Sequence, residues 1–94
     1  MLNEAVVDET KVELATIYPN PASDVLYITL PSANYQDLSM SFYDLTGKVV
    51  STIPMTKGAV KYAVETKDMV SGQYLLVIKM DKTIQTHKVT IAAN

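Results

Sequence analysis

The sequence predicts an all-β domain, an antiparallel sandwich of seven short strands. Apolar and polar residues alternate in most segments, which is typical of strands with one buried face. Pro, Gly, Asn and Asp recur between these segments, at about the 8 to 12 residue spacing of short strands joined by turns. No segment shows the period of an amphipathic helix.

Size and composition fit one folded domain. The 94 residues are 48% hydrophobic and 19% charged, enough to form a core without a metal or crosslink. A net charge of -2, with lysine as the only strongly basic residue type, argues against nucleic-acid and phosphate partners. The lack of cysteine excludes disulfides, thiolate catalysis and cysteine-bound zinc.

The first residues do not resemble the start of a fold. Residues 1–11 are acidic and poorly patterned, with Glu4, Asp8 and Glu9, and they lack a signal peptide's basic and apolar regions. No apolar run approaches the roughly 18 residues of a membrane helix, so no membrane insertion is expected. The chain is either cytoplasmic or a piece of a longer exported precursor. We favour the second, with 1–11 as a linker remnant and 12–94 as the domain.

The first strand is expected over residues 12–18, with Val12 and Leu14 facing the core and Ala15 facing away. Pro19 and Pro21 end it, because neither has an N–H group for a strand ladder. Residues 18–24 should form a rigid corner in which Asn20 favours a turn and Tyr18 packs inward.

The next four strands are expected over residues 25–30, 38–43, 48–53 and 60–65. Asp44 and Gly47 predict a tight hairpin with a bulge between the second and third of these. The inward residues should be Leu26, Ile28, Leu30, Leu38, Met40, Phe42, Val60, Tyr62 and Val64.

The strand at 71–80 is expected to be central, because it holds five consecutive apolar residues after a Ser-Gly turn signal. Before it, Met69 and Val70 should tuck under one end of the sandwich. In the last strand, 83–92, Val89 and Ile91 should face inward. Ile84 is out of phase with them, which predicts a bulge or a register change near residues 86 to 88.

Seven such strands predict an immunoglobulin-like sandwich, with a small barrel as the alternative. We expect no enzyme: the single histidine, His87, is expected to be a solvated or half-buried strand residue, and turn geometry explains Asp24, Asp44, Asp68 and Asp81. No motif predicts a metal ion or another cofactor.

Several apolar side chains are expected on outward faces. Tyr74 and Tyr62 are most simply core residues, whereas an outer interaction patch is a candidate. Its members would be Val25, Tyr27, Tyr43, Leu75 and Val77. The alternative is that middle strands favour such residues on both faces.

Four segments, in this order and spacing, strongly resemble the C-terminal sorting domain, type A, of the type IX (Por) secretion system. They are Tyr18-Pro-Asn-Pro-Ala22 leading to Val25–Ile28, Tyr43-Asp-Leu-Thr-Gly-Lys-Val-Val50, Val70-Ser-Gly-Gln-Tyr-Leu-Leu-Val-Ile78, and Thr86-His-Lys-Val-Thr-Ile91. The resemblance covers nearly all of residues 12–94.

The resemblance implies an immunoglobulin-type sandwich at the end of a larger exported protein of Bacteroidetes. Such a precursor crosses the inner membrane, is recognised in the periplasm through this domain, and passes the outer membrane to the cell surface or beyond. The implied partners are the type IX translocon, a covalently attached N-terminal cargo domain, and a sortase-like peptidase that removes the domain. The domain itself is a label with no catalytic role.

The resemblance also assigns sorting-motif residues. They are Tyr18, Pro19, Asn20, Pro21, Asp44, Gly47, Gly72, Tyr74, Lys88 and Val89. Backbone geometry alone explains Gly47 and Gly72, whereas Lys88 is more easily explained by recognition than by packing. An accessory binding module of a secreted enzyme, either immunoglobulin-like or carbohydrate-binding, is the main alternative. A structural spacer is a weaker one.

Overall fold

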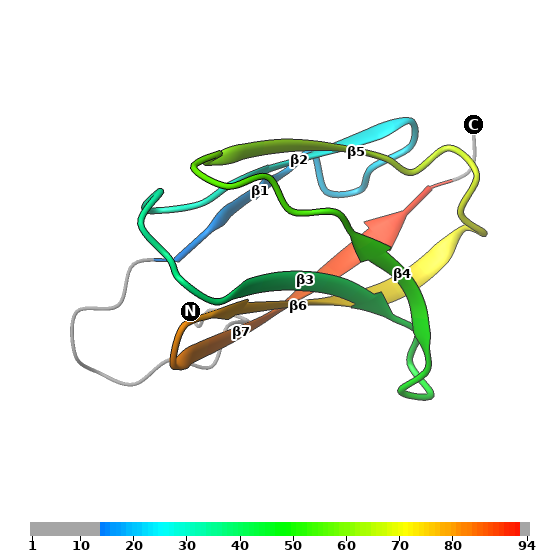
Figure 1. Cartoon of the computed structure of the whole chain (residues 1–94). Coiled ribbons are helices and arrows are strands. Elements are labelled where there is room, and N and C mark those ends of the chain that lie inside the picture. Colours follow the sequence, from blue (N-terminus) through cyan, green and yellow to red (C-terminus); the bar gives the residue numbers. More distant parts are fainter. Residues whose placement is uncertain (1–13, 93–94) are drawn as a thin grey trace.

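The computed structural model describes residues 14–92, which form a two-layered β structure (Figure 1). Within these residues, no helix is long and apolar enough to cross a membrane. The strands of the described part are β1 (Thr16–Tyr18), β2 (Val25–Thr29), β3 (Leu38–Tyr43), β4 (Val49–Ile53), β5 (Lys61–Glu65), β6 (Gly72–Met80) and β7 (Thr83–Ile91).

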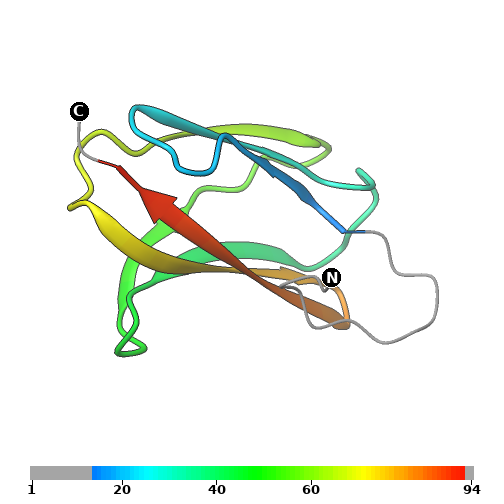
Figure 2. The ribbon, with the colours of Figure 1, turned by 180° about the vertical axis from the view of Figure 1, so that it is seen from behind.

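The strands form two antiparallel sheets packed face to face. One sheet has the order β1-β2-β5 and the other the order β4-β3-β6-β7. The predicted sandwich is therefore confirmed, and the barrel alternative is wrong because the strands do not close into one sheet. The β6 strand lies between β3 and β7, as its apolar sequence predicts. Seen from behind, β7 runs along the near edge of its sheet (Figure 2).

The core lies between the sheets and is built by strand alternation. In β2, Leu26 and Ile28 are fully buried, while Tyr27 between them is 44% exposed. In the larger sheet, Met40 of β3 pairs with Ile78 of β6, and both are fully buried. Phe42 is the largest fully buried side chain. The period-two patterns of β2, β3 and β6 thus predicted the correct inward faces.

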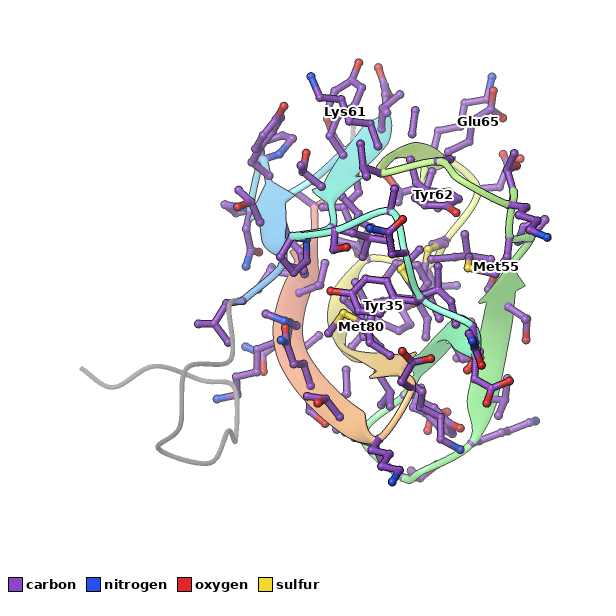
Figure 3. The ribbon with its side chains drawn as sticks, turned by 60° about the vertical axis from the view of Figure 1, so that its left-hand side comes forward. Tyr35, Met55, Lys61, Tyr62, Glu65 and Met80 are labelled. Atoms are coloured by element: carbon purple, nitrogen blue, oxygen red, sulfur yellow. The ribbon has the colours of Figure 1, made fainter. Side chains whose placement is uncertain are left out.

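Two tyrosines belong to the core and use their hydroxyl groups at its ends. Tyr62 points between the sheets, whereas Lys61 and Glu65 of the same strand point outward (Figure 3). The Tyr62 hydroxyl donates to the Thr56 carbonyl at 3.1 Å. The Tyr74 hydroxyl donates to the Val70 carbonyl, four residues upstream. A tyrosine near the start of the sixth strand with this bond is a feature of immunoglobulin-like sandwiches.

The first strand is shorter than predicted and its inward phase is wrong. Val12 lies outside the described residues. Leu14 is 37% exposed and Ala15 is buried, the reverse of the expectation. The Ala15 N–H donates to Gln85 Oε1 at 3.1 Å, which orients this residue toward the interior. Ile17, two residues on, packs against the core from the same side.

Two further inward predictions are wrong. Tyr18 is 48% exposed, because its ring packs on Tyr27 with centroids 5.6 Å apart. Val70 is 79% exposed, because the connection turns its carbonyl toward the Tyr74 hydroxyl. The neighbouring Met69 packs against the core as predicted.

The predicted bulge or register change in the last strand is also absent. Residues of β6 and β7 pair in one unbroken register, from Gly72 opposite Ile91 to Met80 opposite Thr83. The phase conflict is resolved differently: Ile84 points outward and is 52% exposed, while the fully buried Gln85 takes the inward position. The predicted inward positions of Val89 and Ile91 are confirmed.

Candidate recognition site

The corner after β1 is attached to the last strand through one side chain. Asn20 Nδ2 donates to the Lys88 carbonyl at 3.0 Å, and Asn20 Oδ1 accepts from the Thr90 N–H at 2.9 Å. Both peptide bonds that precede a proline here, Tyr18-Pro19 and Asn20-Pro21, are cis. A primary amide with one acceptor and two donors can satisfy both backbone groups of a strand edge at once.

The backbone continues this pairing beyond Asn20. The Ala22 N–H donates to the Thr90 carbonyl at 2.8 Å, and the Ala92 N–H donates to the Ala22 carbonyl at 2.7 Å. Ala22 is fully buried and forms a parallel bridge with Ile91. The edge of β7 is therefore covered from Lys88 to Ala92. Two of the predicted sorting segments, far apart in sequence, form one unit.

The third segment meets this unit from inside the sheet. Gly72 pairs with Ile91, Tyr74 with Val89, and Leu75 with Lys88. Val89 and Tyr74 are buried, whereas Lys88 is exposed on the outer side of the sheet. Of the residues assigned to the last segment, Val89 therefore packs the core and Lys88 is available for recognition.

The fourth segment is the β3–β4 hairpin. Asp44 Oδ1 accepts from the Thr46 hydroxyl at 2.6 Å and from the N–H groups of Thr46 and Lys48 at 2.9 and 3.0 Å. The Thr46 hydroxyl bond is the main cause that lowers the pKa of the Asp44 carboxyl, followed by the Lys48 N–H. Gly47 has a φ of 91°, which a residue with a Cβ rarely adopts.

The hairpin lies at the same end of the sheet as the start of β6 and the end of β7 (Figure 1). Tyr43, the last residue of β3, pairs with Leu75 of β6. The register shift between Phe42 and Tyr43 confirms the predicted hairpin bulge. All four predicted segments are thus connected, through β6 and β7, at one end of the sandwich.

The predicted outer patch does not exist as one surface. Val25 and Tyr27 belong to β2 in the smaller sheet, whereas Tyr43, Leu75 and Val77 belong to the larger sheet. The outer faces of a sandwich point in opposite directions, so the five side chains cannot meet. The prediction of a contiguous patch is wrong because the alternation of side chains along a strand tells which face a residue takes. It does not tell which sheet the strand joins.

Sequence reasoning missed the polar contact inside β7. His87 is half-buried, as expected, and its Nε2 lies 3.0 Å from Gln85 Oε1. The same oxygen accepts the Ala15 N–H. A sequence signal for this contact was available: Gln85 lies an even number of residues before Val89 and Ile91, so it shares their inward face of β7. Among residues 14–92, no group of three or more His, Cys, Asp or Glu could hold a metal ion.

A family model described as the secretion system C-terminal sorting domain matches residues 16–92. The chain belongs to this family. The match runs from the first residue of β1 to the residue after β7, so it includes both sheets of the sorting domain and every segment of the site. A search of curated proteins gives no match.

Membership fixes the coarse role of the sorting domain. It is a C-terminal signal of type IX secretion, the route that exports proteins across the bacterial outer membrane. Its family implies interaction with that secretion machinery and attachment to a cargo. The assignment predicted from the four sequence segments is thereby confirmed at the level of the family.

Proposed function

We propose that this sorting domain carries an N-terminal cargo through the periplasm to the type IX translocon, and that a sortase-like peptidase then removes it at the cell surface. The cargo ends on the outer membrane surface or outside the cell. The observation that carries the proposal is the family match over the whole sandwich, residues 16–92. The domain acts by being recognised and performs no chemistry of its own.

The fold suits a removable label. Its core is closed between two sheets by strand pairing, apolar contacts and side-chain hydrogen bonds within the described domain, so folding requires no contact with the cargo. We place the cut within residues 1–11, before the family match, in the acidic stretch that contains Glu4, Asp8 and Glu9. A peptidase requires an extended substrate, which a linker provides more readily than a paired strand.

The test is a fusion of a signal peptide, a fluorescent reporter and residues 1–94, expressed in a bacterium with a type IX system. We expect the reporter outside the outer membrane, with a mass showing that it ends within residues 1–11. Matched fusions in a strain without the surface peptidase should keep the whole domain. A reporter that stays in the periplasm in the secreting strain contradicts the proposal. A reporter that is exported with the domain still attached contradicts only the cleavage step.

One observation favours a second candidate, an accessory carbohydrate-binding module. Tyr18 and Tyr27 expose 48% and 44% of their surface and lie together on the outer face of the smaller sheet. Aromatic rings with one exposed side suit contact with sugars and other amphipathic ligands. Their planes differ by 42°, so they do not form a flat platform. Calorimetric titration with oligosaccharides, compared between the wild type and Tyr27→Ser, tests this candidate.

A further inference from the structure

The outer face of the four-stranded sheet carries an apolar row that ends in a lysine. Tyr43 of β3 pairs with Leu75 of β6, and Leu75 pairs with Lys88 of β7. On the other side, Tyr43 pairs with Val49 of β4, which is 49% exposed. Residues directly opposite one another share a face. This row therefore crosses all four strands, from Val49 to Lys88.

Two more rows of the same face each contain one aliphatic residue. Val77 of β6 lies between Ser41 and Thr86. Lys79 of β6 lies opposite Ile84 of β7, which is 52% exposed. Exposed edge strands usually carry charges that discourage contact. Here the exposed aliphatic residues reach both edge strands, β4 and β7.

The charge on this face has one sign. None of β3, β4, β6 and β7 contains Asp or Glu, and Lys79 and Lys88 are the only lysines in these four strands. Carboxylates lie at the ends of these strands: Asp44 accepts from the Thr46 and Lys48 N–H groups, Asp81 accepts from two others, and Asp37 and Asp81 line a hollow together with Lys79. In a domain with a net charge of -2, the strands of this face thus carry only positive side-chain charge.

We propose that this face, defined by Tyr43, Leu75, Val77, Lys79, Ile84 and Lys88, is the surface through which the export machinery recognises the domain. We name it the lysine-flanked face. Its partner is a protein surface with an apolar centre bordered by carboxylates, because such a surface complements both the aliphatic row and the two ammonium groups. The proposal rests on the proposed function and names the surface which that function uses.

The size of the face fits a contact that must be released. Strands lie about 4.8 Å apart and rise about 3.3 Å per residue, so the 29 residues of β3, β4, β6 and β7 present roughly 460 Å². A standard stable interface buries about 800 Å² on each partner. The lysine-flanked face alone therefore supports a weak, transient complex, which suits a label that is passed on and removed.

Two other binding partners, a second copy of the chain and a membrane, fit the lysine-flanked face less well. A second copy of the chain would place lysines near lysines across a symmetric contact, which costs affinity. Membrane-binding basic segments gather about four to eight basic residues, whereas this face has two lysines among serines and threonines. The chemistry of the face favours an acidic protein partner over either.

The test compares charge reversal on the two sides of the sandwich in the reporter fusion. Lys79→Glu/Lys88→Glu reverses the lysine-flanked face. Lys61→Glu/Lys67→Glu makes the same net change on the smaller sheet, where Lys61 points away from the core (Figure 3), and in the following turn. We expect the first variant to lower the extracellular reporter at least about tenfold with an unchanged melting temperature. The control variant and Lys79→Arg/Lys88→Arg should match the wild type.

The apolar part of the face has its own pair of variants. Ile84→Ser lies on the face, and Leu14→Ser lies before β1, outside the four sorting segments; both side chains are exposed, so neither change should unfold the domain. Only Ile84→Ser should reduce export. Wild-type export by both the face-reversed and Ile84→Ser variants overturns the inference and leaves the proposed function intact, whereas a wild-type fusion that is not exported overturns both.

Experiments on the purified domain distinguish an acidic protein partner from a second copy of the chain and from a membrane. We expect a monomer in analytical ultracentrifugation, and no sedimentation with vesicles containing phosphatidylserine. A dimer that Lys79→Glu/Lys88→Glu dissociates would make the face a contact between copies. Vesicle binding lost in the same variant would make it a membrane surface. Either result overturns the assignment to an acidic protein partner.

Discussion

Asn20 illustrates how a single side chain joins two distant parts of this chain. Its amide accepts the Thr90 N–H at 2.9 Å and donates to the Lys88 carbonyl at 3.0 Å. Asn20→Ala removes both bonds, and we expect a loss of about 1–2 kcal/mol in the free energy of unfolding. Asn34→Ala, at an exposed loop position, is the control and should change it by less than about 0.5 kcal/mol. Urea unfolding of both variants measures the difference, and equal values would show that the two Asn20 hydrogen bonds contribute no stability.

Asp44 is a single residue that makes the stability of the domain depend on pH. Its folded pKa lies below the usual value of 3.8, because the Thr46 hydroxyl and the Lys48 N–H favour the carboxylate. A group whose pKa is lowered by folding contributes stability above its unfolded pKa and loses it as pH falls through the folded value. The stability difference between the wild type and Asp44→Ala should therefore be larger at pH 7 than at pH 2.5. A difference that grows toward pH 2.5 contradicts the hydrogen-bonding account.

At the scale of elements, the position of β6 inside its sheet sets its local stability. Both of its edges are paired, with β3 and with β7, and Leu76 and Ile78 are fully buried. The β4 strand is paired on one side only. We expect the amides of β6 to exchange with solvent more slowly than those of β4, because open edges lack protection. Hydrogen exchange followed by NMR checks this order, and equally fast exchange in β6 would argue against a central role.

The strands also show how much of the fold the sequence predicts. The alternation around Leu26 and Phe42, and the Asp44–Gly47 turn, predict strands and faces correctly because each signal is local. The inward side chain at Ala15 depends on Gln85, whose amide oxygen accepts the N–H of Ala15, just before β1. Gln85 also takes an inward position in the unbroken register of β7. The Asn20 hydrogen bonds also reach Lys88 and Thr90, which lie 68 and 70 positions further along the chain. Single-sequence patterns carry no information on such contacts.

For the whole molecule, stability depends on one core shared by both sheets. Phe42 is fully buried. Phe42→Ala should cost about 3–5 kcal/mol, a large share of the roughly 5–10 kcal/mol expected for a domain of this size. Leu45→Ala, at a hairpin residue that is 63% exposed, should cost less than about 0.5 kcal/mol. Chemical unfolding compares the two, and a small loss for Phe42→Ala would contradict the single-core description.

The most direct measurement for the whole molecule is the fraction of a reporter found outside the cell when residues 1–94 are fused behind it. The control is the same reporter with its signal peptide and without the domain, in the same secreting bacterium. The account predicts that the fusion appears at the surface or in the medium while the control stays in the periplasm. Equal periplasmic retention of both would contradict it.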